Sequence, residues 1–68
     1  MSQELPMTAR RVVKLIGDQP MWAIRNMVTA LSSMSMLNTA EENERLEAAR
    51  WAIANQREFS IETSKRKR

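Results

Sequence analysis

Apolar residues recur at helical spacing in three segments of the chain. The first segment places four of them at i, i+3, i+4 and i+7: Ala9, Val12, Val13 and Ile16. Thr8 can cap the start of such a helix, and Gly17 can end it. A short helix is therefore expected over residues 8–16. Its opposite face carries the basic residues Arg10, Arg11 and Lys14. Such a face is either ordinary solvated surface or a contact for an acidic partner.

The second segment predicts a helix from about residue 20 to residue 37. Asp18 or Gln19 can cap it, and Pro20 suits its first turn. Its apolar stripe consists of Met21, Ile24, Met27, Val28, Leu31 and Met34. The opposite face is small and uncharged, where a helix facing water normally carries Lys and Glu. We expect this helix to pack on more than one side, in a dimer or against a partner; the alternative is a helix with a merely polar back.

The third segment begins with a capping box, in which Thr39 is the N-cap and Glu42 occupies N3. It predicts a helix over residues 40–58. The second predicted helix ends near residue 37, so the connection to the third is very short. A short connection favours an antiparallel helical hairpin, and the first helix is expected to pack across the open end of that hairpin. The hairpin is expected to bury Ile24, Met27, Leu31 and Met34 against Leu46, Ala49, Ile53 and Phe59.

Composition supports one small all-α domain over residues 1–64. The 68 residues include one Gly and two Pro, which argues against a β-rich fold. No Cys or His is present, and no Gly-rich phosphate loop occurs, so we expect no enzyme activity, no metal site and no cofactor. A domain of this size is marginally stable alone, and disulfide and metal staples are missing. A homodimer is therefore expected.

The net charge gives weak support for nucleic-acid binding. The formal charge is +3, but residues 65–68 alone contribute +4, so the rest of the chain carries −1. We expect these four residues to be a disordered tail. The alternative function is a small DNA-binding transcriptional regulator that uses the basic first helix and the tail. The helix that begins near Pro20 would then enter the DNA groove, and on it only Arg25 and Asn26 are side chains well suited to recognising bases.

Membrane and export signals are not evident in the sequence. The N-terminus does not resemble a signal peptide, and no segment approaches the ~20 apolar residues of a membrane span. The polar face of the second helix also lacks the many Lys and Arg residues that helices lying on a membrane surface carry. We expect a cytoplasmic location.

Two groups of residues are candidates for protein contacts. Trp22 lies about 160° around its helix from Ile24, so it cannot serve the same apolar stripe. Trp is also a favoured anchor at protein interfaces. The expected partner-binding residues are Arg10, Arg11, Lys14, Trp22 and Arg25. The expected dimer or second-interface residues are Asn26, Thr29, Ser33, Met36 and Trp51. Two alternatives stay open for Trp22, which could close the core under the first helix or lie in a dimer seam.

Three segments define the layout of the chain: TARRVVKLIG, PMWAIRNMVTALSSM and LNTAEENERLEAARWAIANQ. This layout resembles small accessory proteins of Mu-like transposable phages. In particular, the chain resembles the quorum-sensing anti-activator group. The resemblance implies a helical dimer that binds host proteins, such as a LuxR-type transcriptional activator or a type IV pilus assembly ATPase. It therefore implies a phage-encoded inhibitor of a bacterial regulator, acting in the cytoplasm of the host.

Overall fold

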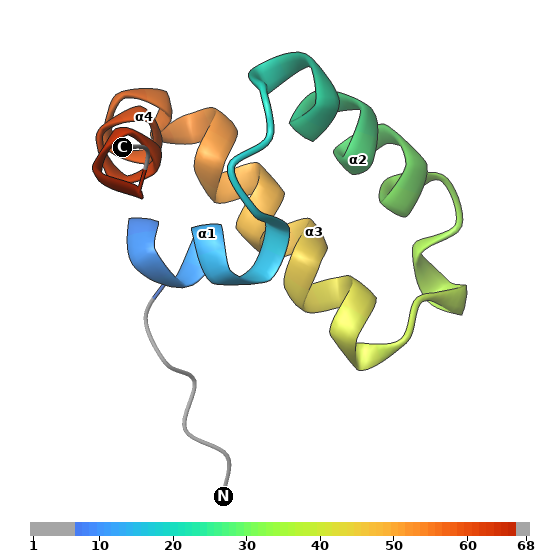
Figure 1. Cartoon of the computed structure of the whole chain (residues 1–68). Coiled ribbons are helices and arrows are strands. Elements are labelled where there is room, and N and C mark those ends of the chain that lie inside the picture. The colour runs from blue at the N-terminus through green and yellow to red at the C-terminus, as the bar shows by residue number, and fades with distance from the viewer. Residues whose placement is uncertain (1–6, 67–68) are drawn as a thin grey trace, which may run out of the picture.

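The computed structural model describes residues 7–66, and in that range all regular elements are helices and no strand occurs (Figure 1). The elements are α1 (Ala9–Ile16), α2 (Met21–Ser33), the 3₁₀ helix η1 (Ser35–Leu37), α3 (Ala40–Ala54) and α4 (Gln56–Arg66). The all-α prediction is confirmed. None of the described helices is long and apolar enough to cross a membrane.

Helix α1 follows its sequence signals closely. The Arg11 backbone N–H donates to Thr8 Oγ1 at 3.2 Å, and Gly17 ends the helix with a positive φ of 79°. Such a backbone conformation is accessible to Gly without strain. One expectation about the next helix was wrong: Gln19 does not cap α2. Its side chain donates to the Ile16 carbonyl at 2.6 Å and so closes the end of α1.

Helix α2 is shorter than predicted at both ends. Pro20 is its N-cap without a side-chain hydrogen bond, and the helix ends at Ser33 rather than at residue 37. Met34 leaves the helical conformation, with φ −138° and ψ 59°, and η1 follows. The Asn38 side chain donates to the Leu31 carbonyl at 2.8 Å. This bond satisfies one of the carbonyls that a helix leaves open at its C-terminus.

The predicted helix over residues 40–58 is two helices. Its capping box is present: the Glu42 N–H donates to Thr39 Oγ1 at 3.1 Å, and the Thr39 N–H donates to Glu42 Oε1 at 2.8 Å. The chain bends at Asn55, where φ is −127° and the side chain donates to the Trp51 carbonyl at 2.9 Å. A side chain that binds a carbonyl of its own helix in this way offers the backbone an alternative to the helical bond.

Helix α4 extends further than the sequence indicates. The expected tail was residues 65–68, but residues 65 and 66 belong to α4, and residues 67–68 lie outside the described range. The first turn of α4 docks on the rest of the fold through Phe59, which is only 3% exposed. Tertiary packing of one apolar face stabilises helices more than intrinsic propensity does.

Helix α3 is the central element of the fold. It contacts α1, α2 and α4, and α4 also packs against α1 (Figure 1). Three alanines of α3 are completely buried and let its neighbours approach closely: Ala48, Ala49 and Ala52. The other buried apolar residues are Val12, Val13, Ile16, Ile24, Leu46 and Phe59. Burying one such Val, Ile or Phe side chain contributes about 1.5–3 kcal/mol.

Two parts of the expected core differ from the structure. Met34 was expected inside, but it is 60% exposed because α2 ends before it. Phe59 is buried as expected, but it lies on α4, which packs against α1 and α3. Met27 and Val28 are only partly buried against the core. Helix α2 therefore supplies just one fully buried side chain, Ile24.

Candidate protein-interaction surface

Most of the exposed large apolar side chains come from α2 and the segment that follows it. Among the described residues, four of the five exposed large apolar side chains belong to α2, η1 or the residue between them: Trp22, Met34, Met36 and Leu37. Trp22 is 68% exposed and Met36 is 91% exposed. The fifth, Ile61, lies on α4. Clustered exposed apolar surface marks interaction sites, whereas single exposed residues are ordinary.

The solvent-facing side of α2 has the spacing of a helix-packing seam. Its four residues recur at intervals of four, three and four positions, and all are exposed: Trp22, Asn26, Thr29 and Ser33. We call these four residues the α2 seam. Ile24, on the opposite side, is 0% exposed. Trp22 therefore does not close the core of its own chain, which excludes the first alternative for this residue.

The hydroxyl groups of the α2 seam are already hydrogen-bonded within the helix. Thr29 Oγ1 donates to the Arg25 carbonyl at 3.1 Å, and Ser33 Oγ donates to the Ala30 carbonyl at 3.0 Å. Burying a polar group is costly chiefly when its hydrogen bond is lost. A second helix could therefore cover these two residues without leaving their donors unsatisfied.

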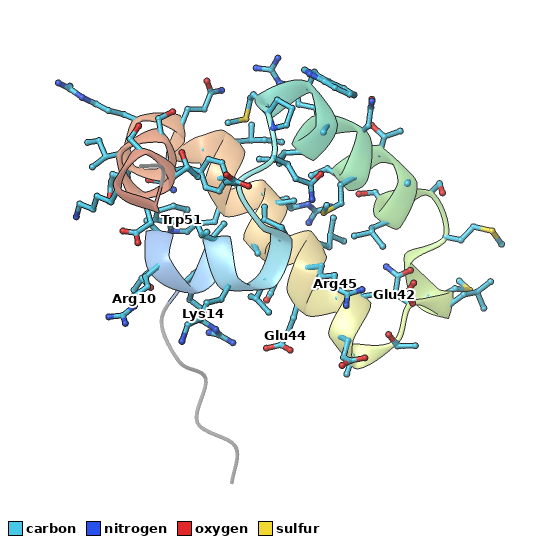
Figure 2. The ribbon with its side chains drawn as sticks, in the orientation of Figure 1. Arg10, Lys14, Glu42, Glu44, Arg45 and Trp51 are labelled. Atoms are coloured by element: carbon cyan, nitrogen blue, oxygen red, sulfur yellow. The ribbon has the colours of Figure 1, made fainter. Side chains whose placement is uncertain are left out.

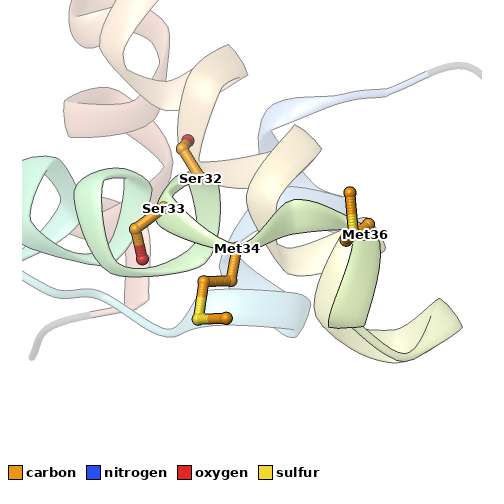
Figure 3. A pocket seen from close by; sticks show the side chains of 4 residues that line it. All are labelled: Ser32, Ser33, Met34 and Met36. Carbon is orange, nitrogen blue, oxygen red and sulfur yellow. The ribbon is translucent and has the colours of Figure 1, made fainter.

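A surface pocket lies where α2 turns into η1. Four residues line it, Ser32, Ser33, Met34 and Met36, around a volume of about 270 Å³ (Figure 3). We call it the η1 pocket. Arg50 Nη2 of α3 donates to Ser32 Oγ at 3.3 Å and ties this end of α2 to the centre of the fold. Two flexible Met side chains make the wall of the pocket adaptable to the shape of a ligand side chain.

Met34 and Leu37 are surface residues that the apolar pattern did not predict. Their exposure follows from the end of α2 at Ser33, because beyond it the apolar periodicity no longer describes a helix face. The signal available in the sequence was the pair Ser32–Ser33, since serines compete with the helix for backbone hydrogen bonds. Charge was informative as well: residues 26–40 contain none.

The basic residues of α1 lie apart from Trp22. Arg10 and Lys14 are exposed. In Figure 2 both side chains extend below α1, whereas α2 begins above it. Arg11 instead contacts α3, where its Nη2 lies 2.9 Å from Glu44 Oε2. Arg25 is exposed on α2. The structure thus does not bring Arg10 and Lys14 around Trp22 as one patch.

Trp51 belongs to the edge of the core. It was expected in a dimer or second interface, but it is partly buried and packs against the core cluster. In the view of Figure 2 it lies between α1 and α4. The reason is that α3 is covered on more than one side, by α1 as well as by α2. The assignment of Trp51 to a second interface is therefore replaced by a packing role within the chain.

No family model, curated protein or solved structure matches this chain. Within the described range, no group of three or more acidic residues is arranged to hold a metal ion. No buried side-chain polar atom there lacks a hydrogen-bond partner. The exposed, uncharged surface formed by the α2 seam, the η1 pocket and Leu37 is therefore the feature that requires a functional explanation.

Proposed function

We propose that the chain is a small protein-binding inhibitor that blocks a bacterial regulator. Two exposed surfaces support this proposal: the α2 seam with η1, which fits a second protein chain, and the cations Arg10 and Lys14 of α1, which fit an acidic target. The resemblance to the anti-activator group supports a phage-encoded inhibitor, with a LuxR-type activator as target and a type IV pilus assembly ATPase as a second. We further propose that α2 and α3 form an antiparallel hairpin and that the protein is a homodimer.

The basic side of α1 is the surface that we assign to the target. Arg10 and Lys14 are one helical turn apart, and neither forms an ion pair with another described residue. Cations of this kind favour a partner with an acidic surface and accelerate its association. Because Arg11 is held by Glu44, it contributes less to this surface than its neighbours.

A charge-reversal experiment tests the target surface. The double variant Arg10→Glu/Lys14→Glu should weaken binding to a purified LuxR-type activator at least tenfold, or about 1.4 kcal/mol. The matched control is Arg57→Glu, which reverses an exposed charge on α4 and should change binding less than twofold. The readout is release of the activator from its DNA site as the inhibitor is added. Equal inhibition by both variants would reject this surface.

The alternative function, DNA binding, has its own test. If the chain bound DNA through Arg10, Lys14 and the basic C-terminus, its affinity for random duplex DNA would fall steeply with salt. We expect no measurable duplex binding at physiological salt. Tight, salt-dependent binding that is lost on deletion of residues 65–68 would replace the inhibitor proposal with the DNA-binding one.

A further inference from the structure

The residues of the α2 seam are arranged symmetrically along the helix. Trp22 and Ser33 are equally far from the point between residues 27 and 28, and Asn26 and Thr29 are equally far from the same point. If two copies of this helix packed antiparallel about that point, Trp22 of each would face Ser33 of the other. Asn26 of each would likewise face Thr29 of the other. A two-fold interface requires this kind of self-complementary pattern.

We propose that the outer face of α2 docks on the same face of a second copy, with each Trp22 inserted into the η1 pocket of the other. The proposal rests on the homodimer proposed above and assigns its interface. Trp22 and Ser33 are eleven residues apart, so the projecting side chain and the receiving pocket are separated by about 16 Å along the helix. The antiparallel arrangement brings both pairs together at once.

The chemistry of the seam suits a second copy better than a charged partner. Four residues are exposed between Trp22 and the η1 pocket, and three of them are small, which favours a close approach of two helix axes: Asn26, Thr29 and Ala30. The fourth, Arg25, is long and charged. The Thr29 hydroxyl donates to its own helix and retains lone pairs, which can accept from the Asn26 amide of the second copy. Arg25 is the only charge on α2, and it is not one of the four seam residues.

Complementarity within a single face distinguishes a second copy from other occupants. A different protein would need a matching groove for Trp22 and a matching projection for the η1 pocket. The outer face of α2 already carries both the projecting Trp22 and the receiving η1 pocket. A two-fold rotation would place each Trp22 opposite the η1 pocket of the other copy. Trp is also the residue type most typical of interface anchors. A host protein that occupies this face instead is one outcome of the tests below.

Two variants test the interface by sedimentation velocity over a concentration series. Trp22→Ala removes the anchor, and Thr29→Arg places a cation beside the two-fold axis, near Arg25 of both copies. Each should raise the dimer dissociation constant at least tenfold. The matched controls on α4 are Ile61→Ala, which removes an exposed apolar side chain, and Ser60→Arg, which adds an exposed cation. Both controls should leave the dissociation constant within twofold of the original.

Cross-linking tests the direction of the two helices, because the natural chain contains no Cys. Under oxidation, an equimolar mixture of Asn26→Cys and Thr29→Cys chains should form mainly the mixed disulfide. A parallel pairing would instead give mainly the Asn26–Asn26 and Thr29–Thr29 homodimers, since a disulfide needs Cα atoms about 4.4–6.8 Å apart. Predominance of the homodimers would overturn the antiparallel arrangement.

The outcomes separate this proposal from the proposed function. An unchanged dimer in Trp22→Ala, with circular dichroism showing a folded chain, would overturn the interface and leave the inhibitor proposal standing. Trp22→Ala that stays dimeric but no longer binds the LuxR-type activator would assign this face to the target. A stable monomer in the unmodified protein at micromolar concentrations would reject the dimer itself. Monomeric Trp22→Ala that still binds the activator supports both proposals.

Discussion

Helices α3 and α2 have similar lengths but contrasting environments. Helix α3 contacts α1, α2 and α4 and buries four residues, Leu46, Ala48, Ala49 and Ala52. Helix α2 packs mainly on α3 and buries only Ile24. The exposed part of α3 carries charges, among them Glu47 and Arg50, whereas that of α2 carries Arg25 alone. A helix that is open to water yet carries a single charge is suited to packing against a further partner. Helix α3 already packs against several partners within the chain.

The largest expected effect is at the junction of α1, α3 and α4. Phe59→Ala should destabilise the fold by about 3–5 kcal/mol, because a large side chain is lost from a packed site and a cavity remains. Phe59 is 3% exposed and belongs to the core cluster. Thermal melts followed by circular dichroism measure the loss. A change below about 1 kcal/mol would show that α4 does not contribute to the core.

The two sides of α2 should respond differently to truncation. Ile24→Ala should cost about 2–5 kcal/mol of folding stability, since Ile24 is fully buried. Trp22→Ala should change the stability of the monomer by no more than about 0.5 kcal/mol, because its side chain is 68% exposed. Urea unfolding at a concentration where the protein is monomeric makes the comparison. Equal losses would contradict the distinction between an inner and an outer face.

The start of α3 should contribute an intermediate amount. Thr39→Ala removes the acceptor for the Glu42 N–H and should cost about 1 kcal/mol. Thr39→Ser keeps a hydroxyl and serves as the control. Chemical denaturation of both variants measures the difference. If Thr39→Ser lost as much as Thr39→Ala, a role for the threonine methyl group would be indicated instead of the capping bond.

The smallest effect is expected at the ion pair between α1 and α3. Glu44→Gln should change stability by at most about 0.5 kcal/mol, because exposed ion pairs are weak and screened by salt. The side chains of Arg11 and Glu44 are 27% and 49% exposed. Denaturation at low and at high salt checks this point. A loss of several kcal/mol would show that α1 is held to α3 chiefly by charge, in contrast to the apolar packing of Val12 and Val13.

Local signals in the sequence determined several features of the structure. The bounds of α1 follow from the Thr8 cap, the apolar spacing and Gly17, and the start of α3 follows from its capping box. The opposite orientations of Ile24 and Trp22 follow from helical geometry alone. These features depend on residues within a few positions of each other, so a single sequence contains all the information that they require.

Other features were decided only by tertiary packing. Phe59 docks beside α1 on a separate helix, α4, where the apolar pattern predicted one helix over residues 40–58. The packing of α1 on α3 covers Trp51, which the helix pattern alone directs to solvent. The hydrogen bond from Asn38 to Leu31 closes α2 early, and this end exposes Met34. Each depends on where one element meets another, which helical periodicity within a single segment does not encode.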